Sequence, residues 1–510
     1  MDNLLSILTF IPLLAALILA VFLRGDDEAA QRNAKWLAVT ATGATFLVAL
    51  ILWSAFDPAM DGFQYVEERA WPLGLTYRMG VDGISLGFIV TVTGLAPLAV
   101  AASWRIDERV RDYVIALLTA ETFLLGALLS LDLAFFVVFF EGALIPVLLL
   151  AGLWGSKGAG HAAFKGFLYA LPGMVLLVVA LSALARNAVT TDISALLRHN
   201  FPEESQTLIL LGLAWTIAVK LPLCPLHSWL PPLVARTPAA GLIVLTGMSA
   251  TLGLYLLMRF ALPMLPLGVL ELWPYAVALA ILTFVATGLA AYVQERMTLA
   301  IGYLAIATMM LPVLATLSLT AMGIDAALIG MLARGLTLAG LFIAVTIIEA
   351  RLRSDAFEYM GGIRLRLPGF ALLLMLFCLA MFGLPGTAAF PALALSAYGS
   401  YGTAFWLTLV LVIGAMGLAV LGAGLYRQIA LGDLLREDVR TMAAMDGRER
   451  LAMSLAAGAL VIMGLVPGLL LGPVGTSTAA LSETVQREIV ELSEEALEAA
   501  AAQTDETPSE

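Results

Sequence analysis

The stretch Asp132-Leu-Ala-Phe-Phe-Val-Val-Phe-Phe-Glu141-Gly-Ala-Leu-Ile-Pro-Val-Leu-Leu-Leu-Ala-Gly152 decides the class of this protein. Its interior carries one charge, Glu141, and is otherwise apolar over a length that crosses a bilayer as a helix. Comparable runs recur along the 510 residues, which are 61% hydrophobic and 13% charged. Soluble globular proteins are about 25% charged. The sequence therefore predicts an all-α polytopic membrane protein.

Hydropathy along the chain predicts about 14 transmembrane helices. Their expected ranges are 5–23, 36–54, 84–102, 113–130, 132–152, 165–186, 206–224, 237–261, 269–291, 298–319, 324–348, 367–388, 402–426 and 451–472. The connections on one side contain eighteen lysines and arginines, and those on the other side contain six. Because basic residues favour the cytoplasmic side, we expect a bacterial inner-membrane protein with both termini in the periplasm.

Two of the predicted spans, the seventh and the twelfth, are interrupted by proline. The seventh runs into Lys220-Leu-Pro-Leu-Cys-Pro-Leu-His-Ser-Trp-Leu-Pro-Pro232, and the twelfth contains Gly383-Leu-Pro-Gly-Thr387. Proline removes a helical hydrogen bond, and broken helices at corresponding places are typical of transporters with inverted repeats. Kinks without a function are the alternative interpretation.

The position of these breaks predicts five parts of the chain, with two inverted five-helix repeats in the middle. The parts are helices 1–3 in 1–112, the first repeat with helices 4–8 in 113–262, the second repeat with helices 9–13 in 263–427, a cytoplasmic connection with helix 14 in 428–477, and an acidic periplasmic tail in 478–510.

The cysteines, the absence of nucleotide-binding motifs and the distribution of charge argue against several kinds of site and partner. Cys224 and Cys378 lie in apolar segments without a CxxC or Cys/His cluster, which argues against a zinc or iron–sulfur site. The chain has no GxGxxG sequence after a strand and no Walker sequence. Its net charge of −11 is concentrated in the tail, where Glu483–Glu510 contains nine acidic residues and one basic residue. We expect no metal or cofactor in this chain and no nucleic-acid partner.

Charged residues inside predicted spans mark a functional site by default. Glu141 lies in the middle of span five, and Lys220 ends the first half of the broken span seven. If the two approach, each stabilises the charged form of the other while burial favours the neutral forms. This balance suits a proton relay, and a structural ion pair is the alternative. His227 either extends the relay or caps and packs against the break.

Two further cations lie in predicted spans. Lys165 is either a second cation near Glu141 or a side chain that reaches toward the membrane interface. Arg334 keeps its charge and does not relay protons readily, so it needs acceptors such as carbonyls at a helix break. We favour a structural role for Arg334. Asp82, before the third span, is expected to cap that helix.

Several motifs together resemble one known family over essentially the whole chain. They are Arg24–Trp36, Gly80–Ser85, Phe139–Pro146, Thr190–Ile193, Ala218–Lys220, Pro225–Pro231 and Gly383–Thr387. These segments are similar to the subunit M family of bacterial proton-pumping NADH–quinone oxidoreductase (respiratory complex I), antiporter-like membrane subunits related to the Mrp cation/proton antiporters.

The resemblance implies roles for individual residues and partners. Glu141 and Lys220 match the proton-handling pair of the family's first half-channel, and His227 and Lys165 match a histidine and a lysine of its motifs. The family's subunit binds neither NADH nor quinone, so FMN, iron–sulfur clusters and quinone are expected in partner subunits. The expected neighbours are the L-like and N-like antiporter subunits and the lipid bilayer.

The chain departs from the family at several channel positions. Counted without gaps, the family's central lysine falls on Thr251 and the glutamate of its output side falls on Leu393. Family histidines fall on Val234, near Ala307 and on Arg334. Since threonine and leucine do not titrate at accessible pH, the central and output stations of the proton path are expected to be lost, while the input pair survives.

Three functions are consistent with these observations. The favoured one is a non-redox membrane-arm subunit of NADH–quinone oxidoreductase whose own proton translocation is impaired or lost. The second is a component of an Mrp-type cation/proton antiporter. The third is a structural member of the membrane arm that does not conduct.

Overall fold

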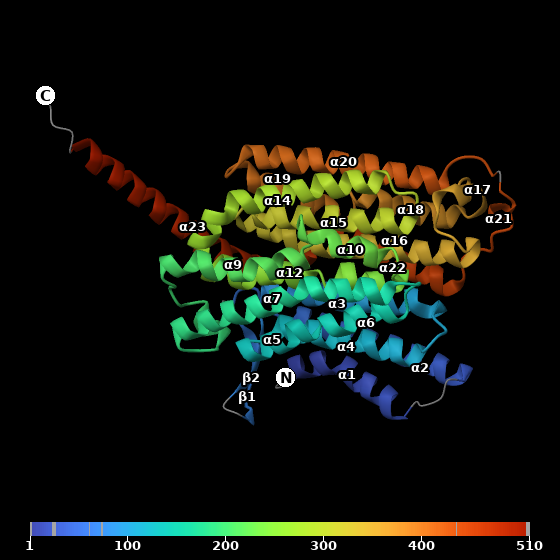
Figure 1. Cartoon of the computed structure of the whole chain (residues 1–510), viewed down its shortest axis with the longest axis horizontal. Helices are drawn as coiled ribbons and strands as arrows, with labels where there is room; N and C mark the ends of the chain where they lie inside the picture. The colour runs from blue at the N-terminus through green and yellow to red at the C-terminus, as the bar shows by residue number, and fades with distance from the viewer. Residues whose placement is uncertain (1–2, 23–26, 61, 73–74, 435, 506–510) are drawn as a thin grey trace.

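The computed structural model describes residues 3–22, 27–60, 62–72, 75–434 and 436–505. In this part of the chain the protein is mostly helical, and its long helices lie side by side in one bundle (Figure 1). Eleven helices among the described residues are long and apolar enough to cross a membrane, or twelve if one bent pair forms a single span. The prediction of a helical polytopic membrane protein is therefore confirmed.

The unbroken membrane-length elements follow the predicted spans closely. They are α1 (Leu4–Phe22), α2 (Glu28–Ala55), α3 (Gly83–Ala102), α4 (Val110–Leu129), α5 and α6 (Leu133–Gly142 and Leu144–Leu153), α7 (Ala159–Ala188), α14 (Pro266–Tyr292), α15 (Met297–Thr316), α16 (Ala321–Leu352) and α20 (Phe405–Ala430). The short interruption between α5 and α6 falls at Ala143, because Pro146 has no N–H to donate to the carbonyl four residues earlier.

The span over Ala239–Met264 changes its helical geometry along its length. It consists of α11 (Ala239–Leu242), η4 (Ile243–Met248), α12 (Thr251–Leu256), η5 (Leu257–Ala261) and α13 (Leu262–Met264). The segments η4 and η5 are π-helical, a geometry that is rare and frequent at functional sites. The whole span is buried inside the bundle.

Two predicted spans, the seventh and the twelfth, are interrupted by proline-containing turns and are not among the eleven membrane-length helices. The first is α9 (Glu203–Lys220), which is followed by a turn, the 3-10 segment η3 (Leu226–Trp229) and α10 (Leu230–Val234). The second consists of α18 (Pro368–Ala380) and α19 (Ala389–Tyr401), with turns between them. The chain thus leaves helical geometry at both places where the sequence predicts a break.

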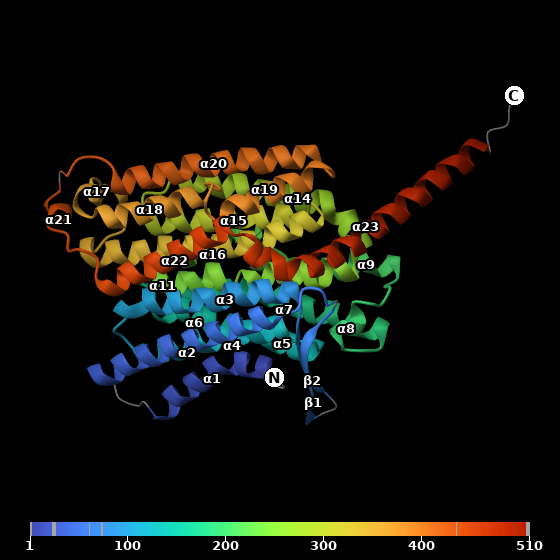
Figure 2. The same cartoon turned by 180° about the vertical axis from the view of Figure 1, so that it is seen from behind.

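Burial separates the helices into a core and an outer layer. The core consists of α3, α16 and the span from α11 to α13, and α16 packs against α3, α15, α18 and α19. By contrast α1, α7, α14 and α20 keep many large apolar side chains exposed. Figures 1 and 2 show α1 and α20 on opposite edges of the bundle. Exposed apolar helix faces of this kind are expected to contact lipid.

A β-hairpin that the all-α prediction does not include lies at one end of the bundle, beside α8 (Ile193–Leu196) (Figure 2). Its strands β1 (Gln64–Ala70) and β2 (Thr76–Val81) are antiparallel. The Glu67 carboxylate accepts hydrogen bonds from the backbone N–H groups of Leu5 and Ser6 at the start of α1. The hairpin therefore depends on a contact with a distant helix, which local sequence patterns do not reveal.

The remaining short elements and the last helices complete the fold. At the other end of the bundle lie η2 (Ser103–Arg105), η6 (Phe357–Tyr359), α17 (Ile363–Arg366) and α21 (Glu437–Arg440). The helix α22 (Gly447–Leu465) ends before Pro467, and α23 (Gly468–Asp505) continues at an angle of 63°. Figure 2 shows α23 extending away from the bundle. The sequence prediction extends the last span to 472, whereas Pro467 places the bend earlier.

Candidate functional site

Glu141 lies near the end of α5, two residues before the interruption at Ala143. Its carboxylate atom Oε1 is buried and has no hydrogen-bond partner among the described residues. A carboxylate in the apolar interior without a partner is costly. Such a group is more consistent with a functional site than with a structural contact.

Lys220 is the last residue of α9, because Pro222 and Pro225 prevent the helix from continuing. Its Nζ atom lies 5.0 Å from the centre of the Phe140 ring, next to Glu141 in the chain, and this nitrogen too is buried without a hydrogen-bond partner. Glu141 and Lys220 interact electrostatically, but they form no ion pair within 4.0 Å. The structure thus brings the predicted pair near each other without direct contact.

A cavity of about 40 Å³ lies beside Lys220, and we call it the chamber. A cavity of about 10–15 Å³ measured in this way already holds a water molecule. Its polar lining residues are Lys220, Trp229, Thr246, Ser249 and Arg334. They come from α9, η3, η4, the turn after η4, and α16. The broken helix and the π-helical segment therefore open onto the same space.

Arg334 of α16 forms the wall of the chamber opposite the break. Its Nη1 donates a hydrogen bond of 2.8 Å to the Thr246 carbonyl in η4, and its Nη2 donates one of 2.7 Å to the Ala305 carbonyl in α15. The side chain is 8% exposed, and its Nε atom has no partner in the described part of the chain. Both acceptors are backbone carbonyls, but they lie in the π-helical η4 and in the continuous helix α15 rather than at a helix break.

A second cavity of about 50 Å³ lies on the other side of Arg334. Leu393 of α19 lines it together with Gly383 and Ser396 near the break after α18. Arg334 lines both cavities, so a single fixed cation separates them. Leu393 therefore lines the same cavity as Arg334.

Two more departures from the family pattern, Thr251 and Val234, are buried and accounted for by local packing. Thr251 is fully buried and donates a 2.6 Å hydrogen bond to the Met248 carbonyl, and it does not line the chamber. Val234 is also fully buried and lies directly against Gly302 of α15. Neither position offers a proton acceptor or donor to the chamber.

His227 and Lys165 lie around the 3-10 segment after the break. The Lys165 ammonium donates a hydrogen bond of 3.3 Å to the Ser228 carbonyl, and the Tyr169 hydroxyl lies 2.8 Å from the Ser228 hydroxyl. Both contacts hold η3 against α7. His227 Nδ1 is buried and unpartnered within the described residues. The structure thus places Lys165 beside the break, where it supports η3.

Sequence reasoning missed one buried acidic group and one buried ion pair. Glu121 of α4 is fully buried, and neither of its carboxylate oxygens has a partner among the residues that the structure describes. It stands in an apolar run like that of Glu141, which is the signal that would have found it. Asp82 caps α3 through the Ser85 N–H as expected, but it also forms an unpredicted 2.5 Å ion pair with Arg259.

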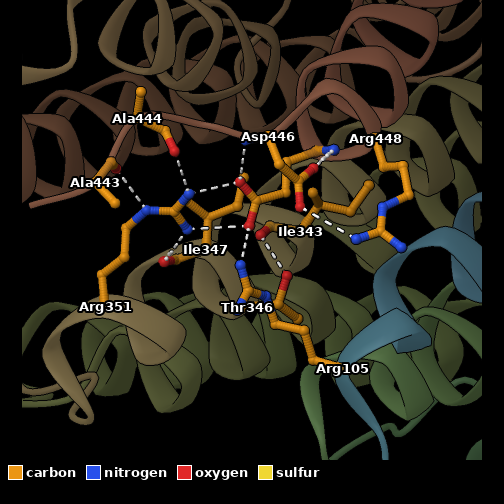
Figure 3. Close-up of polar contacts among 10 residues, drawn as sticks. Arg105, Ile343, Thr346, Ile347, Arg351, Ala443, Ala444, Asp446 and Arg448 are labelled. Atoms are coloured by element: carbon orange, nitrogen blue, oxygen red, sulfur yellow. Dashed lines mark hydrogen bonds and ion pairs between the residues drawn. The ribbon is translucent and has the colours of Figure 1, made fainter. Parts of the chain in front are cut away.

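A separate polar cluster ties α22 to the core at the end of the bundle opposite the hairpin. Arg351 of α16 and Arg105 of η2 contact the Glu449 carboxylate at 2.6 and 2.7 Å. Figure 3 shows Arg351 pointing toward the Ala443 and Ala444 carbonyls, with Arg105 approaching from another segment. This cluster orders the connection before α22 and lies outside the chamber.

Comparisons with known proteins give a consistent set of relatives. A family model described as NADH:quinone oxidoreductase/Mrp antiporter, TM, matches residues 130–419. NADH-quinone oxidoreductase subunit M of Rhodobacter capsulatus is 38% identical over 502 residues, with coverage of 96% of this chain and 98% of the relative.

Two solved structures resemble the fold. In respiratory complex I from Thermus thermophilus with bound NADH, one chain matches with a TM-score of 0.85 and 26% identity, covering 94% of this chain and 99% of that chain. A chain of the Mrp complex from Dietzia sp. matches with a TM-score of 0.79 and 21% identity, covering 93% of this chain and 52% of that chain. The second match concerns the fold alone.

Proposed function

The chain belongs to the subunit M family of NADH–quinone oxidoreductase, the antiporter-like membrane subunits of respiratory complex I, and we propose that its chamber retains the input half of a proton path whose central and output stations are lost. The observation that carries the proposal is that Glu141 Oε1 and Lys220 Nζ are both buried without a hydrogen-bond partner, and that Lys220 lines a cavity which also reaches the fixed cation Arg334. A carboxylate and an amine that share a low-dielectric site exchange protons when their surroundings change.

The loss of the later stations is supported by what lines the path beyond Lys220. The second cavity contains Arg334 and Leu393 but no carboxylate, histidine or lysine. A guanidinium keeps its proton at accessible pH and therefore does not relay one. The path thus has a side chain that does not exchange protons where the family has titratable groups, and this chain serves the membrane arm mainly as a structural and input element.

The architecture and location complete the proposal. We count fourteen spans by adding the two broken elements to the eleven membrane-length helices and the bent pair α22–α23. Helices 4–8 and 9–13 then form two inverted repeats, each with one broken helix, between the N-terminal helices of 1–112 and the parts 428–477 and 478–510. Basic residues of the connections lie at the end of the bundle with α17 and α21. We take this end as the cytoplasmic one, with both termini in the periplasm of a bacterial inner membrane.

The chain itself is proposed to be a non-redox subunit. FMN, iron–sulfur clusters and quinone belong to partner subunits, and the neighbours in the membrane arm are L-like and N-like antiporter subunits. A component of an Mrp-type antiporter is the second candidate, because the Mrp fold match covers nearly the whole chain. Purification separates the two candidates: flavin and iron–sulfur subunits copurify with this chain under the first and are absent under the second.

Restoring titratable groups is expected to restore proton translocation. Leu393→Glu combined with Ser249→Lys places a carboxylate in the second cavity and an amine in the chamber, since both residues line these spaces. Thr251→Lys is the alternative to Ser249→Lys, although Thr251 does not line the chamber. In vesicles containing the complex, the number of protons moved per electron pair should rise above that of the unmodified complex.

Size-matched controls make this test specific. Leu393→Gln with Ser249→Met should leave the proton ratio at its starting value, because neither side chain titrates. Glu141→Gln added to the restored variant should abolish the gain, whereas Glu141→Gln alone should not change the ratio. A lower ratio after Glu141→Gln alone would show that the unmodified subunit conducts, and the proposed interruption would be wrong.

A further inference from the structure

The free polar groups that line the chamber include an unusual set of hydrogen-bond donors. Lys220 Nζ, Trp229 Nε1 and Arg334 Nε are all buried and have no partner within the described part of the chain. An indole N–H donates and never accepts, and the same holds for an ammonium and a guanidinium. Buried indole N–H groups usually find a partner. Three such donors around one cavity therefore indicate a missing acceptor.

The charges around the chamber do not balance. Lys220 and Arg334 contribute two positive charges, and Glu141 is the acidic group that interacts with Lys220. Arg334 has no carboxylate within 4.0 Å among the described residues, and both of its bonded partners are neutral carbonyls. An uncompensated cation in the membrane interior is strongly unfavourable. One negative charge in the chamber would neutralise it.

The surroundings also fit a small ligand. The chamber volume is about 40 Å³, which is enough for a small inorganic ion. Trp229 is 8% exposed and lies against Gly166, so its ring position is fixed by packing. Ser249 supplies a hydroxyl to the same lining. Water fills polar cavities of this size, but water carries no charge and leaves Arg334 uncompensated.

We propose that the chamber binds one small monovalent inorganic anion of the halide class, such as chloride, with Lys220, Trp229 and Arg334 as its donors. The anion neutralises Arg334 and provides the acceptor that the three nitrogens lack. The inference goes beyond the proposed function, because it requires only these charges and the cavity and does not depend on proton transfer. It also gives Arg334 a ligand-binding role in place of a purely structural one.

The direct test uses bromide as the probe. Crystals of the purified complex grown with bromide in place of chloride should show an anomalous scattering peak in the chamber, close to the nitrogens of Trp229 and Arg334. Density for water alone, without an anomalous peak, would overturn the proposal. This readout is independent of turnover, so its failure would leave the proton-path proposal standing, and the reverse also holds.

A solution measurement tests the role of the individual donors. At constant ionic strength, bromide or chloride should raise the melting temperature of the complex relative to gluconate, with a saturable dependence on concentration. Trp229→Phe keeps the ring and removes one donor, and it should raise the concentration for half-maximal effect about 10-fold or more, as loss of a hydrogen bond to a charged group does. Arg334→Met should abolish the effect.

A matched control shows whether the change comes from the chamber. Trp273 donates its indole N–H to the Leu317 carbonyl at 2.7 Å and does not line the chamber. Trp273→Phe therefore also loses one indole hydrogen bond but should keep the halide response of the unmodified complex. If Trp229→Phe and Trp273→Phe respond to halide alike, the chamber does not bind the anion through Trp229, and the proposal is wrong.

Discussion

Arg259→Met is expected to destabilise the protein by about 3–5 kcal/mol, the usual effect of removing one partner from a buried ion pair. Arg259 and Asp82 lie 2.5 Å apart, and their side chains are 5% and 9% exposed. Without the guanidinium, the Asp82 carboxylate would stay buried with only the Ser85 N–H as a partner. The denaturant midpoint of the complex in detergent measures the change.

A second variant separates the ion pair from the general packing of α3. Asp82→Ser keeps an oxygen that can cap α3 and removes the charge. Combined with Arg259→Met, it should recover most of the lost stability, because removing both charges leaves no unpaired ion. A double variant as unstable as Arg259→Met alone would contradict the role of the pair.

The same pair predicts how stability depends on pH. Burial alone would raise the pKa of the Asp82 carboxyl, but the neighbouring Arg259 guanidinium lowers it below its ordinary value. Because the pKa of Asp82 is lower in the folded state, the pair makes its full contribution to the free energy of unfolding above the pKa of the carboxyl in the unfolded chain, about 3.9. The contribution is lost as the pH falls through the folded value. The midpoint difference between the wild type and the double variant should therefore stay constant above about pH 5 and change below it.

Glu449→Ala is expected to lower stability by about 3 kcal/mol, the lower end of the range for a broken buried pair. The Glu449 carboxylate holds Arg351 and Arg105 and also closes the capping box of α22 with Asp446. Arg351 is nearly buried and would keep only its neutral carbonyl partners (Figure 3). The denaturant midpoint of the complex again measures the loss.

An exposed ion pair on the same side of the molecule provides the control. Glu437 and Arg440 lie 3.9 Å apart and are 77% and 58% exposed. Exposed pairs of this kind contribute about 0–1 kcal/mol, so Glu437→Ala should change the midpoint little. If Glu437→Ala and Glu449→Ala had equal effects, the cluster at Glu449 would not be the contact that holds α22.

Much of the site could be predicted from the sequence, because its elements depend on local chemistry. Pro222 and Pro225 end α9 at Lys220 wherever that helix packs, since proline cannot continue it. Glu141 lies in an apolar run, and because burying a charge is unfavourable, the sequence alone predicts a functional site there. The membrane class and the two broken helices followed from the same kind of local argument.

Only the tertiary structure decided which groups face one another. Thr246, Ala305 and Arg334 lie far apart in the chain, and nothing in their sequence neighbourhoods indicates that two carbonyls and a guanidinium share one contact. The hairpin also depends on a remote partner, the start of α1. Hydropathy indicates how much apolar surface a segment can bury, but it does not indicate the direction in which the side chains of the segment point. The donor-lined chamber and the cation that closes it exist only because several helices bring their irregular turns to one point.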